Sequence, residues 1–372
     1  MKIGIDGYEA NTSQRVGVGQ YAYQLLVQLE KLDKKNEYTI FLPQIPRADL
    51  PVPSETWRYV VGKPGSFWTI KQLPFLIKKQ PLDLFFSPTH YLPWFTQVPK
   101  VMSIMDVSYL HFPEMFRKKD LLQLRYMGRH SIQHAHKILT ISEFSKKEII
   151  KYYTYPEENI IVTYPGISSK LKVPIRQAQD RQSSKFSQGD KSWEKGRYIL
   201  FVGTIQPRKN IVRLVEAFEK LQQKDVQLVL VGKKGWLYQL ILERIEGSIK
   251  KSHIQWLDYV ADADLPSLYQ NARCFVLPSL YEGFGIPVVE AMIYGCPVVV
   301  SRRSSLPEVA GEAGIYVDPE NSNDIADGIS KALQLSKTER VALVHKGKEQ
   351  AKKFTWENCA QKTIGAFESI KL

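Results

Sequence analysis

Short apolar runs alternate with amphipathic helical patterns, in two series, along this chain of 372 residues. In the first series, strands are predicted at Ile3–Gly7, Tyr38–Leu42, Leu84–Ser87, Val101–Met105 and Lys137–Thr140, and helices at Val18–Glu30, Trp68–Lys79, Leu121–Ala135 and Ser145–Tyr152. In the second, strands are predicted at Tyr198–Gly203, Gln227–Gly232, Ile254–Leu257, Arg273–Leu277 and Pro297–Ser301, and helices at Ile211–Gln222, Trp236–Ser248, Asp262–Gln270, Pro287–Tyr294 and Ser322–Leu335. Alternation of this kind favours parallel sheets flanked by helices. The pattern therefore predicts an α/β fold.

A polar stretch separates the two series. The segment 170–197 is rich in Gln, Ser and Lys and has neither helical nor strand periodicity, which is typical of a linker or exposed loop. We therefore expect two α/β domains that meet at a cleft, at 1–175 and 197–355, joined by a linker at 176–196. A last helix within 356–372 is expected to return to the first domain.

The charge balance restricts the choice of partner. Fifty-one Lys and Arg against 38 Asp and Glu give a net charge of +13, which favours anionic partners such as nucleotide diphosphates, acidic lipids or nucleic acid. No zinc-finger spacing, basic heptad region or RNP-like strand is present, so nucleic acid is not expected. Three scattered cysteines are too few for a disulfide framework, and no apolar run approaches the roughly 18–20 residues that span a bilayer. A cytoplasmic location is expected, with no signal peptide.

The segment PSLYEGFGIPVVEAM follows the predicted strand Arg273–Leu277 and leads into a helix. In open α/β sheets, ligands bind at the carboxyl ends of the strands. Gly283 and Gly285 allow close backbone approach, and the carboxylates of Glu282 and Glu290 suit the vicinal hydroxyls of sugars and riboses. An ordinary strand–turn–helix with two solvated glutamates is the alternative.

A second candidate site follows the strand that ends at Gly203. Two adjacent cations, Arg208 and Lys209, precede a helix there, as in a pyrophosphate clamp. A solvated helix start would give the same residues.

The first domain has a Gly-x-Gly turn at Gly17 and Gly19, before a helix. A dinucleotide site is not expected, because the third glycine is absent and no acidic residue ends the next strand.

Taken together, PSLYEGFGIPVVEAM, the downstream GCPVVVSRRSSLPEVAGEAGIYVDP and the upstream FVGTIQPRKN resemble glycosyltransferase family 4 over most of the chain. The resemblance implies the GT-B fold, with two Rossmann-like domains facing a central cleft. It implies that Glu282 holds the sugar hydroxyls and Glu290 the ribose, and that Arg208 and Lys209 stabilise the leaving diphosphate. Gly203, Val260, Gly283, Phe284 and Gly285 would also contact the donor.

The resemblance is weaker in the first domain. The loop of Gly17 and Gly19 would lie near the donor phosphates, and Asp106 would belong to the catalytic site, although a helix-capping role is equally open to it. Met105 stands where relatives carry a histidine that contacts the transferred sugar. His90 and Tyr91, after another strand, are candidates for acceptor binding, with a packed histidine as the alternative. The basic segment 116–130 is either a helix packed on the sheet or a surface that binds an anionic membrane.

The sequence therefore predicts a retaining hexosyltransferase that uses a GDP- or UDP-sugar, with mannose favoured, to extend a glycan or lipid-linked acceptor in cell-surface polysaccharide assembly. No metal or other cofactor is expected. Asp262 and Asp264 match the letters of a metal-binding DxD motif, but they are interpreted as the start of a helix. A nucleotide-sugar epimerase, a phosphorolytic enzyme or a non-catalytic glycan-binding or membrane-binding scaffold is the alternative. A peripheral position on the inner face of the cell membrane is expected.

Overall fold

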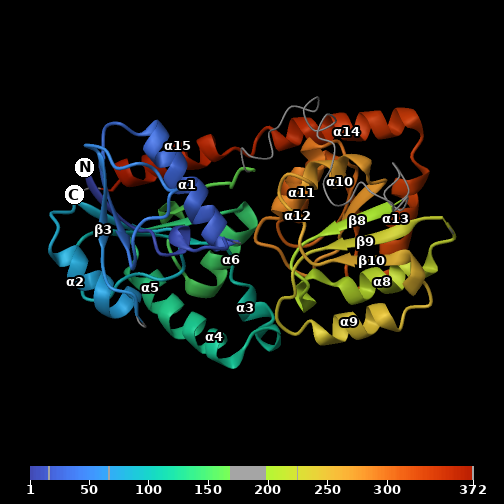
Figure 1. The fold of residues 1–372 in the computed structure, drawn as a ribbon, viewed down its shortest axis with the longest axis horizontal. Helices are drawn as coiled ribbons and strands as arrows, with labels where there is room; N and C mark the ends of the chain where they lie inside the picture. The colour runs from blue at the N-terminus through green and yellow to red at the C-terminus, as the bar shows by residue number, and fades with distance from the viewer. Residues whose placement is uncertain (16, 66–67, 168–197, 224, 371–372) are drawn as a thin grey trace. The chain divides into compact units, whose positions relative to one another are not determined.

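The computed structural model describes residues 1–15, 17–65, 68–167, 198–223 and 225–370. It divides the chain into two compact units (Figure 1). The N-terminal unit comprises Met1–Pro113, Arg117–Gly166 and the chain from Thr355 onward. The C-terminal unit comprises Glu114–Phe116 and Ile167–Phe354. The first unit thus includes the chain up to Gly166, and the short segment Glu114–Phe116 belongs to the second unit. The predicted boundary at 175 and the predicted linker 176–196 lie outside the described residues.

The sheet of the N-terminal unit has seven strands, all parallel, in the order β3-β2-β1-β4-β5-β6-β7. Their bounds are β1 Lys2–Asp6, β2 Glu37–Leu42, β3 Trp57–Val61, β4 Leu84–Ser87, β5 Lys100–Ile104, β6 Lys137–Thr140 and β7 Ile160–Val162. The chain runs outward from β1 in one direction to β3, and in the other from β4 to β7. The boundary between β1 and β4 is therefore the topological switch point of this sheet.

The sheet of the C-terminal unit has six parallel strands in the order β10-β9-β8-β11-β12-β13. Their bounds are β8 Tyr198–Val202, β9 Gln227–Val231, β10 Ile254–Leu257, β11 Cys274–Leu277, β12 Val298–Ser301 and β13 Gly314–Val317. Here the switch point lies between β8 and β11. The predicted α/β class with parallel sheets is confirmed.

Helices cover the two sheets (Figure 1). In the N-terminal unit they are α1 Val18–Leu32, α2 Leu73–Lys78, α3 Ser108–His111, α4 Lys118–Gln123, α5 Arg129–His134, α6 Glu143–Tyr153 and α15 Trp356–Glu368. In the C-terminal unit they are α8 Ile211–Lys220, α9 Gln239–Glu246, α10 Leu265–Asn271, α11 Ile286–Ile293, α12 Leu306–Ala310, α13 Ser322–Gln334 and α14 Lys337–Ala351. Their ends follow local chemistry: the Ser142 side chain caps α6, and Ser336 with Glu339 forms a capping box on α14.

The helix predicted at Leu121–Ala135 is interrupted. A π-helical turn at Leu124–Gly128 separates α4 from α5, and another at Trp68–Gln72 precedes α2. Such turns are common at functional sites. Among the described residues, no helix is long and apolar enough to cross a membrane.

The last helix, α15, packs against α1 in the N-terminal unit. The ring centroids of Trp356 and Tyr21 lie 5.7 Å apart, and the Cys359 thiol donates to the Thr163 carbonyl. At Gly166 the chain passes so close to the backbone of Trp356 that a Cβ atom would overlap it. The C-terminal helix is therefore part of the core of the first unit.

Candidate functional site

Two loops meet at the switch point of the C-terminal unit. One follows β8 and contains a 3-10 turn at Pro207–Lys209, and the other follows the neighbouring strand β11. The backbone N–H of Leu280 donates to the Arg208 carbonyl at 2.9 Å, which ties the loops together. This contact places the predicted cations beside Glu282.

Lys209 and Glu282 form a buried ion pair. The Lys209 Nζ atom lies 2.6 Å from Glu282 Oε1, and the two residues are only 8% and 5% exposed. The Arg208 Nη1 atom lies 3.5 Å from Glu282 Oε2 and donates to the Tyr281 carbonyl at 3.0 Å. Two positive charges and one negative charge are therefore concentrated at one point, with a net positive balance.

Glu282 is held in its ionised form. Burial alone would raise its pKa, but the charges of Lys209 and Arg208 outweigh burial, and the pKa lies below its usual range. The Ser279 hydroxyl also donates to Oε1 at 2.7 Å. The carboxylate is therefore a charged acceptor at neutral pH.

Serine and asparagine side chains fix the two loops. The Asn210 amide donates to the carbonyls of Pro278 and Pro319 at 2.9 and 2.6 Å, and Asn210 itself adopts the left-handed conformation, φ 61°. The Ser305 hydroxyl donates to the Glu282 carbonyl at 2.9 Å, and the Glu282 N–H donates to the Ser304 hydroxyl at 3.0 Å. Glu282 thus has both its backbone and its side chain fixed.

The loop that contains Gly283 and Gly285 leads directly into α11. Gly285 has φ 105° and precedes the helix, with Pro287 in the first turn. The Phe284 ring is 3% exposed and packs edge-on against Phe354, so its side chain belongs to the core. Val260 is similarly buried, and Gly203 directly follows β8.

Glu290 lies on α11 and faces α10. The Tyr269 hydroxyl donates to its Oε2 atom at 2.8 Å. Burial raises the pKa of Glu290 to about 7, which the Tyr269 hydrogen bond partly opposes and the charge of Asp262 reinforces. Unlike Glu282, Glu290 has no cation partner among the ion pairs of the described residues.

The remaining predicted residues lie in the N-terminal unit. Gly17 has φ 51° and precedes α1, and Gly19 lies within that helix. Asp106 follows β5 and accepts from the Ser108 N–H at 2.8 Å, one residue before Val107, the N-cap of α3. His90 and Tyr91 follow β4 and line a pocket at the carboxyl end of that strand. Their catalytic or binding roles stay predictions.

Several residues of these sites are not identified by sequence reasoning. Asn210 has a partial signal, because asparagine is favoured in the left-handed conformation. No sequence signal marks Ser279, Ser305 or Tyr269, since serines and tyrosines near strand ends are common. Asp6, buried at the end of β1, has the weak signal of a carboxylate inside an apolar strand. Within the part of the chain that the structure describes, no three His, Cys, Asp or Glu residues are grouped as metal ligands.

Comparisons with known proteins agree on one family. A family model described as Glycosyltransferase Family 4 matches residues 16–171, and one described as Glycosyl transferases group 1 matches residues 182–353. The chain is 34% identical over 380 residues to O-antigen chain mannosyltransferase B of Escherichia coli, covering 95% of this chain and 96% of that protein. It is 30% identical over 243 residues to the serotype-specific mannosyltransferase WbdA of Escherichia coli, covering 64% of this chain and 29% of that protein. The structure of HepE from Anabaena, in complex with UDP and glucose, matches with a TM-score of 0.73 at 19% identity, covering 100% of both chains.

Proposed function

Because this chain belongs to glycosyltransferase family 4 and is a hexosyltransferase with the GT-B fold, we propose that its C-terminal unit binds a nucleotide diphosphate sugar. The observation that carries the proposal is the buried ion pair of Lys209 and Glu282, with Arg208 beside it, at the switch point of the sheet. The positive balance suits a diphosphate, and the charged carboxylate suits sugar hydroxyls.

Lys209 can serve both partners at once. Its ammonium group donates to Glu282 at 2.6 Å, and its positive charge also attracts a phosphate oxygen. As the glycosidic bond to phosphate breaks, negative charge gathers on the leaving diphosphate, where Lys209 and Arg208 stabilise it electrostatically. We propose that the reaction needs no divalent metal, because these two cations supply the charge.

Glu282 suits sugar binding better than nucleophilic attack. A carboxylate has about four acceptor positions, and Lys209, Ser279 and Arg208 engage three of them. The position that remains suits one sugar hydroxyl. A nucleophilic carboxylate of the kind used by retaining glycosidases needs an oxygen free to attack the sugar. Retention of configuration is therefore proposed to come from the departing phosphate, which receives the acceptor proton and guides the acceptor onto the face that it leaves.

Glu290 is proposed to hold the ribose. It lies eight residues beyond Glu282 in sequence, on α11, which begins directly after the loop that carries Glu282. When ionised, it can accept from both vicinal hydroxyls of a ribose. The donor would be a GDP- or UDP-sugar, with mannose favoured because the two Escherichia coli relatives are mannosyltransferases.

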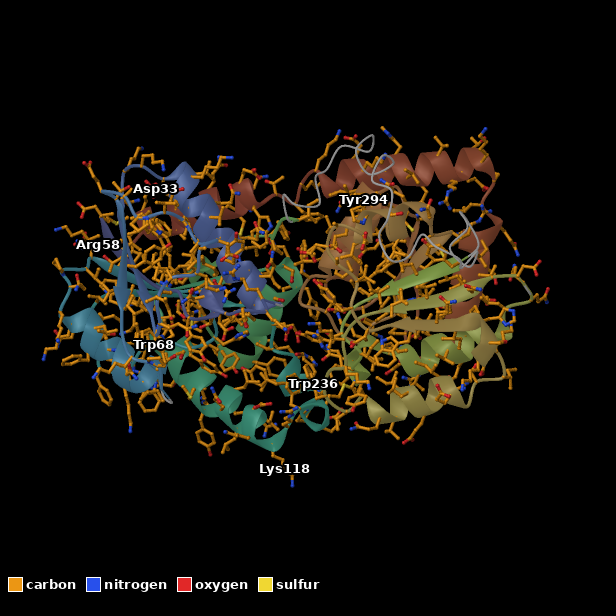
Figure 2. All side chains as sticks on the ribbon, in the orientation of Figure 1. Asp33, Arg58, Trp68, Lys118, Trp236 and Tyr294 are labelled. Atoms are coloured by element: carbon orange, nitrogen blue, oxygen red, sulfur yellow. The ribbon has the colours of Figure 1, made fainter. Side chains whose placement is uncertain are left out.

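The pathway is the assembly of a cell-surface polysaccharide, in keeping with the O-antigen relative. The acceptor would be a glycan or a lipid-linked glycan, bound at the inner face of the cell membrane. Exposed Leu122 and Tyr126 accompany Lys118 on one basic segment, and Lys118 points away from the unit (Figure 2). This combination supports peripheral contact with anionic lipids. Flotation with phosphatidylglycerol vesicles, and no flotation with phosphatidylcholine vesicles, is the expected result.

A donor screen followed by a transfer assay tests the proposed function. GDP-, UDP- and ADP-sugars are first compared by thermal shift, where a specific ligand at 100 times its dissociation constant stabilises the fold by about 2.7 kcal/mol. The best ligand is then incubated with mannosylated acceptors. We expect nucleoside diphosphate release that depends on the acceptor. Conversion of the donor without an acceptor would indicate an epimerase. A reaction that depends on inorganic phosphate would indicate a phosphorolytic enzyme. Either result would overturn the proposal.

A further inference from the structure

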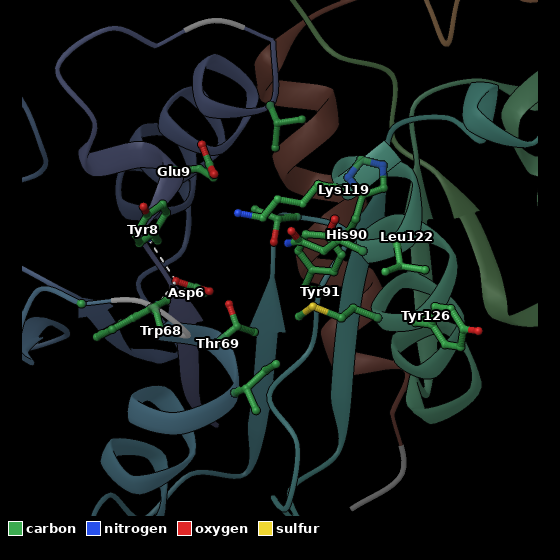
Figure 3. A pocket seen from close by; sticks show the side chains of 16 residues that line it. Asp6, Tyr8, Glu9, Trp68, Thr69, His90, Tyr91, Lys119, Leu122 and Tyr126 are labelled. Atoms are coloured by element: carbon green, nitrogen blue, oxygen red, sulfur yellow. Dashed lines mark hydrogen bonds between the residues drawn. The ribbon is translucent and has the colours of Figure 1, made fainter. Parts of the chain in front are cut away.

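A pocket of about 890 Å³ lies wholly within the N-terminal unit (Figure 3). Asp6 lines it at the carboxyl end of β1, and His90 lines it just after β4. These two strands flank the topological switch point of the sheet, where open α/β sheets bind ligands. Its volume is within the range of about 300–1,000 Å³ that small-molecule sites occupy.

Asp6 is the buried polar group of this pocket. It is 3% exposed, and its Oδ1 atom accepts from the Trp68 indole N–H and the Tyr8 backbone N–H, both at 3.0 Å. No described residue donates a hydrogen bond to the other oxygen, Oδ2. Burial raises the pKa of Asp6 to about 6, although both hydrogen bonds oppose the shift. The carboxylate therefore lacks donors that a bound hydroxyl would supply.

A second carboxylate, Glu9, lines the same pocket, and its charge contributes to the raised pKa of Asp6. The described lining residues include one Lys or Arg side chain, the exposed Lys119. Burial lowers the pKa of His90, which keeps that imidazole neutral. A third negative charge brought into the pocket would be repelled by both carboxylates, with one solvated cation to offset them.

The aromatic and aliphatic side chains that line the pocket suit the C–H faces of a sugar. Trp68 and Tyr8 lie on the side of Asp6, and Leu122 and Tyr126 lie on the opposite side (Figure 3). Aromatic and aliphatic side chains pack against the C–H faces of a pyranose ring, while carboxylates accept from its hydroxyls.

We propose that this pocket binds the terminal sugar of the acceptor, that the sugar is a neutral hexopyranose, and that Asp6 and Glu9 select it against uronic acids and sugar phosphates. The inference rests on the proposed function, because it takes the acceptor of the hexosyl transfer as the ligand. It adds the chemical class of that acceptor and the two residues that determine it.

The test measures sugar binding to the full chain without any nucleotide. Methyl glycosides of mannose, glucose and galactose are each compared with the matching uronate by saturation-transfer NMR titration. We expect at least one neutral glycoside to bind, and its uronate to bind at least about tenfold more weakly. Equal binding of the two members of a pair, or no binding by any neutral glycoside, would overturn the inference.

Asp6→Asn keeps an acceptor for Trp68 and Tyr8 but removes the charge. It should weaken binding of the neutral glycoside by about 10- to 100-fold, as expected for a lost charge-assisted bond. It should also reduce the ratio of the neutral glycoside's affinity to that of its uronate. If circular dichroism shows that Asp6→Asn does not fold, Glu9→Gln should narrow the same preference. Glu30→Gln, an α1 carboxylate paired with Lys34 outside the pocket, is the matched control and should bind as wild type does. Unchanged preference in the folded pocket variants contradicts the inference.

Failure here and failure of the proposed function are distinguishable. If the chain binds a nucleotide sugar but shows no preference for a neutral hexoside, only this inference is refuted. A chain that binds neutral hexosides but no nucleotide sugar loses the proposed donor site.

Discussion

Lys209 and Glu282 bind each other in the structure, although the sequence assigns them to different parts of the ligand. A buried pair of this kind contributes little net stability, but removal of one partner leaves a buried charge uncompensated. The pairing therefore makes Lys209 a structural as well as a functional residue. A variant at this position must be judged by stability and by binding together.

Lys209→Met is expected to lower the free energy of unfolding by about 3 kcal/mol, the lower end of the usual range, because Arg208 stays near Glu282. The double variant Lys209→Met/Glu282→Gln should regain most of that loss, since neither partner of the pair is left as an uncompensated charge and Arg208 keeps its bond to the Tyr281 carbonyl. Urea denaturation of the three proteins measures both values. A single variant as stable as wild type would show that the pair does not form in solution.

Glu290 differs from Glu282 because it has no cation partner among the described ion pairs. Burial raises its pKa from 4.5 to about 7. Between these two values the unfolded chain is ionised at Glu290 while the folded chain keeps the proton. Stability contributed by this group is therefore lost as pH rises through that window. A group that opposes folding at neutral pH is typical of functional sites.

Glu290→Gln should raise the melting temperature relative to wild type at pH 8. It should have little effect at pH 4, where the Glu290 carboxyl is mostly protonated in both the folded and the unfolded chain. Thermal unfolding at the two pH values measures the difference. The variant is also expected to lose transfer activity. A melting temperature that falls equally at both pH values would contradict the raised pKa.

At the scale of elements, the strands and helices next to the candidate sites were predictable from sequence, and the missing ones have physical reasons. The strands β8 and β11 are continuous apolar runs, which periodicity identifies. The strands β3, β7 and β13 were not predicted. The first is a half-exposed edge strand, the second has three residues, and the third is an edge strand of four residues. The helix α14 has no apolar stripe, so its sequence resembles a polar loop.

The docking of α15 depends on a glycine that no sequence pattern indicates. Gly166→Ala should destabilise the protein, because the added Cβ would overlap the backbone of Trp356. Gly365→Ala, on the exposed face of the same helix, meets no atom within 4 Å and should stabilise by about 0.5–1 kcal/mol. Urea denaturation of both variants provides the comparison. Equal effects would mean that α15 is not packed at Gly166.

At the scale of the molecule, each unit has its candidate site at the switch point of its own sheet. The sequence was sufficient for the family and the α/β class, which are confirmed. It also indicated Arg208, Lys209, Glu282 and Glu290 as site residues, because these lie within continuous motifs, and their roles stay predictions. It did not identify Asp6 beside Trp68, or Tyr269 beside Glu290, because those residues are 62 and 21 positions apart in the chain. Contacts between distant segments require the topology of the sheet, which motifs do not specify.

The most direct test of the donor site is calorimetric titration of GDP-mannose and UDP-glucose into the wild-type chain and into Lys209→Met/Glu282→Gln. The double variant retains the fold on the argument above, so a change in affinity reports on the site itself. We predict that wild type binds one of these nucleotide sugars, and that the double variant binds it at least about tenfold more weakly, as for a lost charge-assisted contact. Equal affinity in the two proteins would contradict the assignment of Lys209 and Glu282 to the donor site.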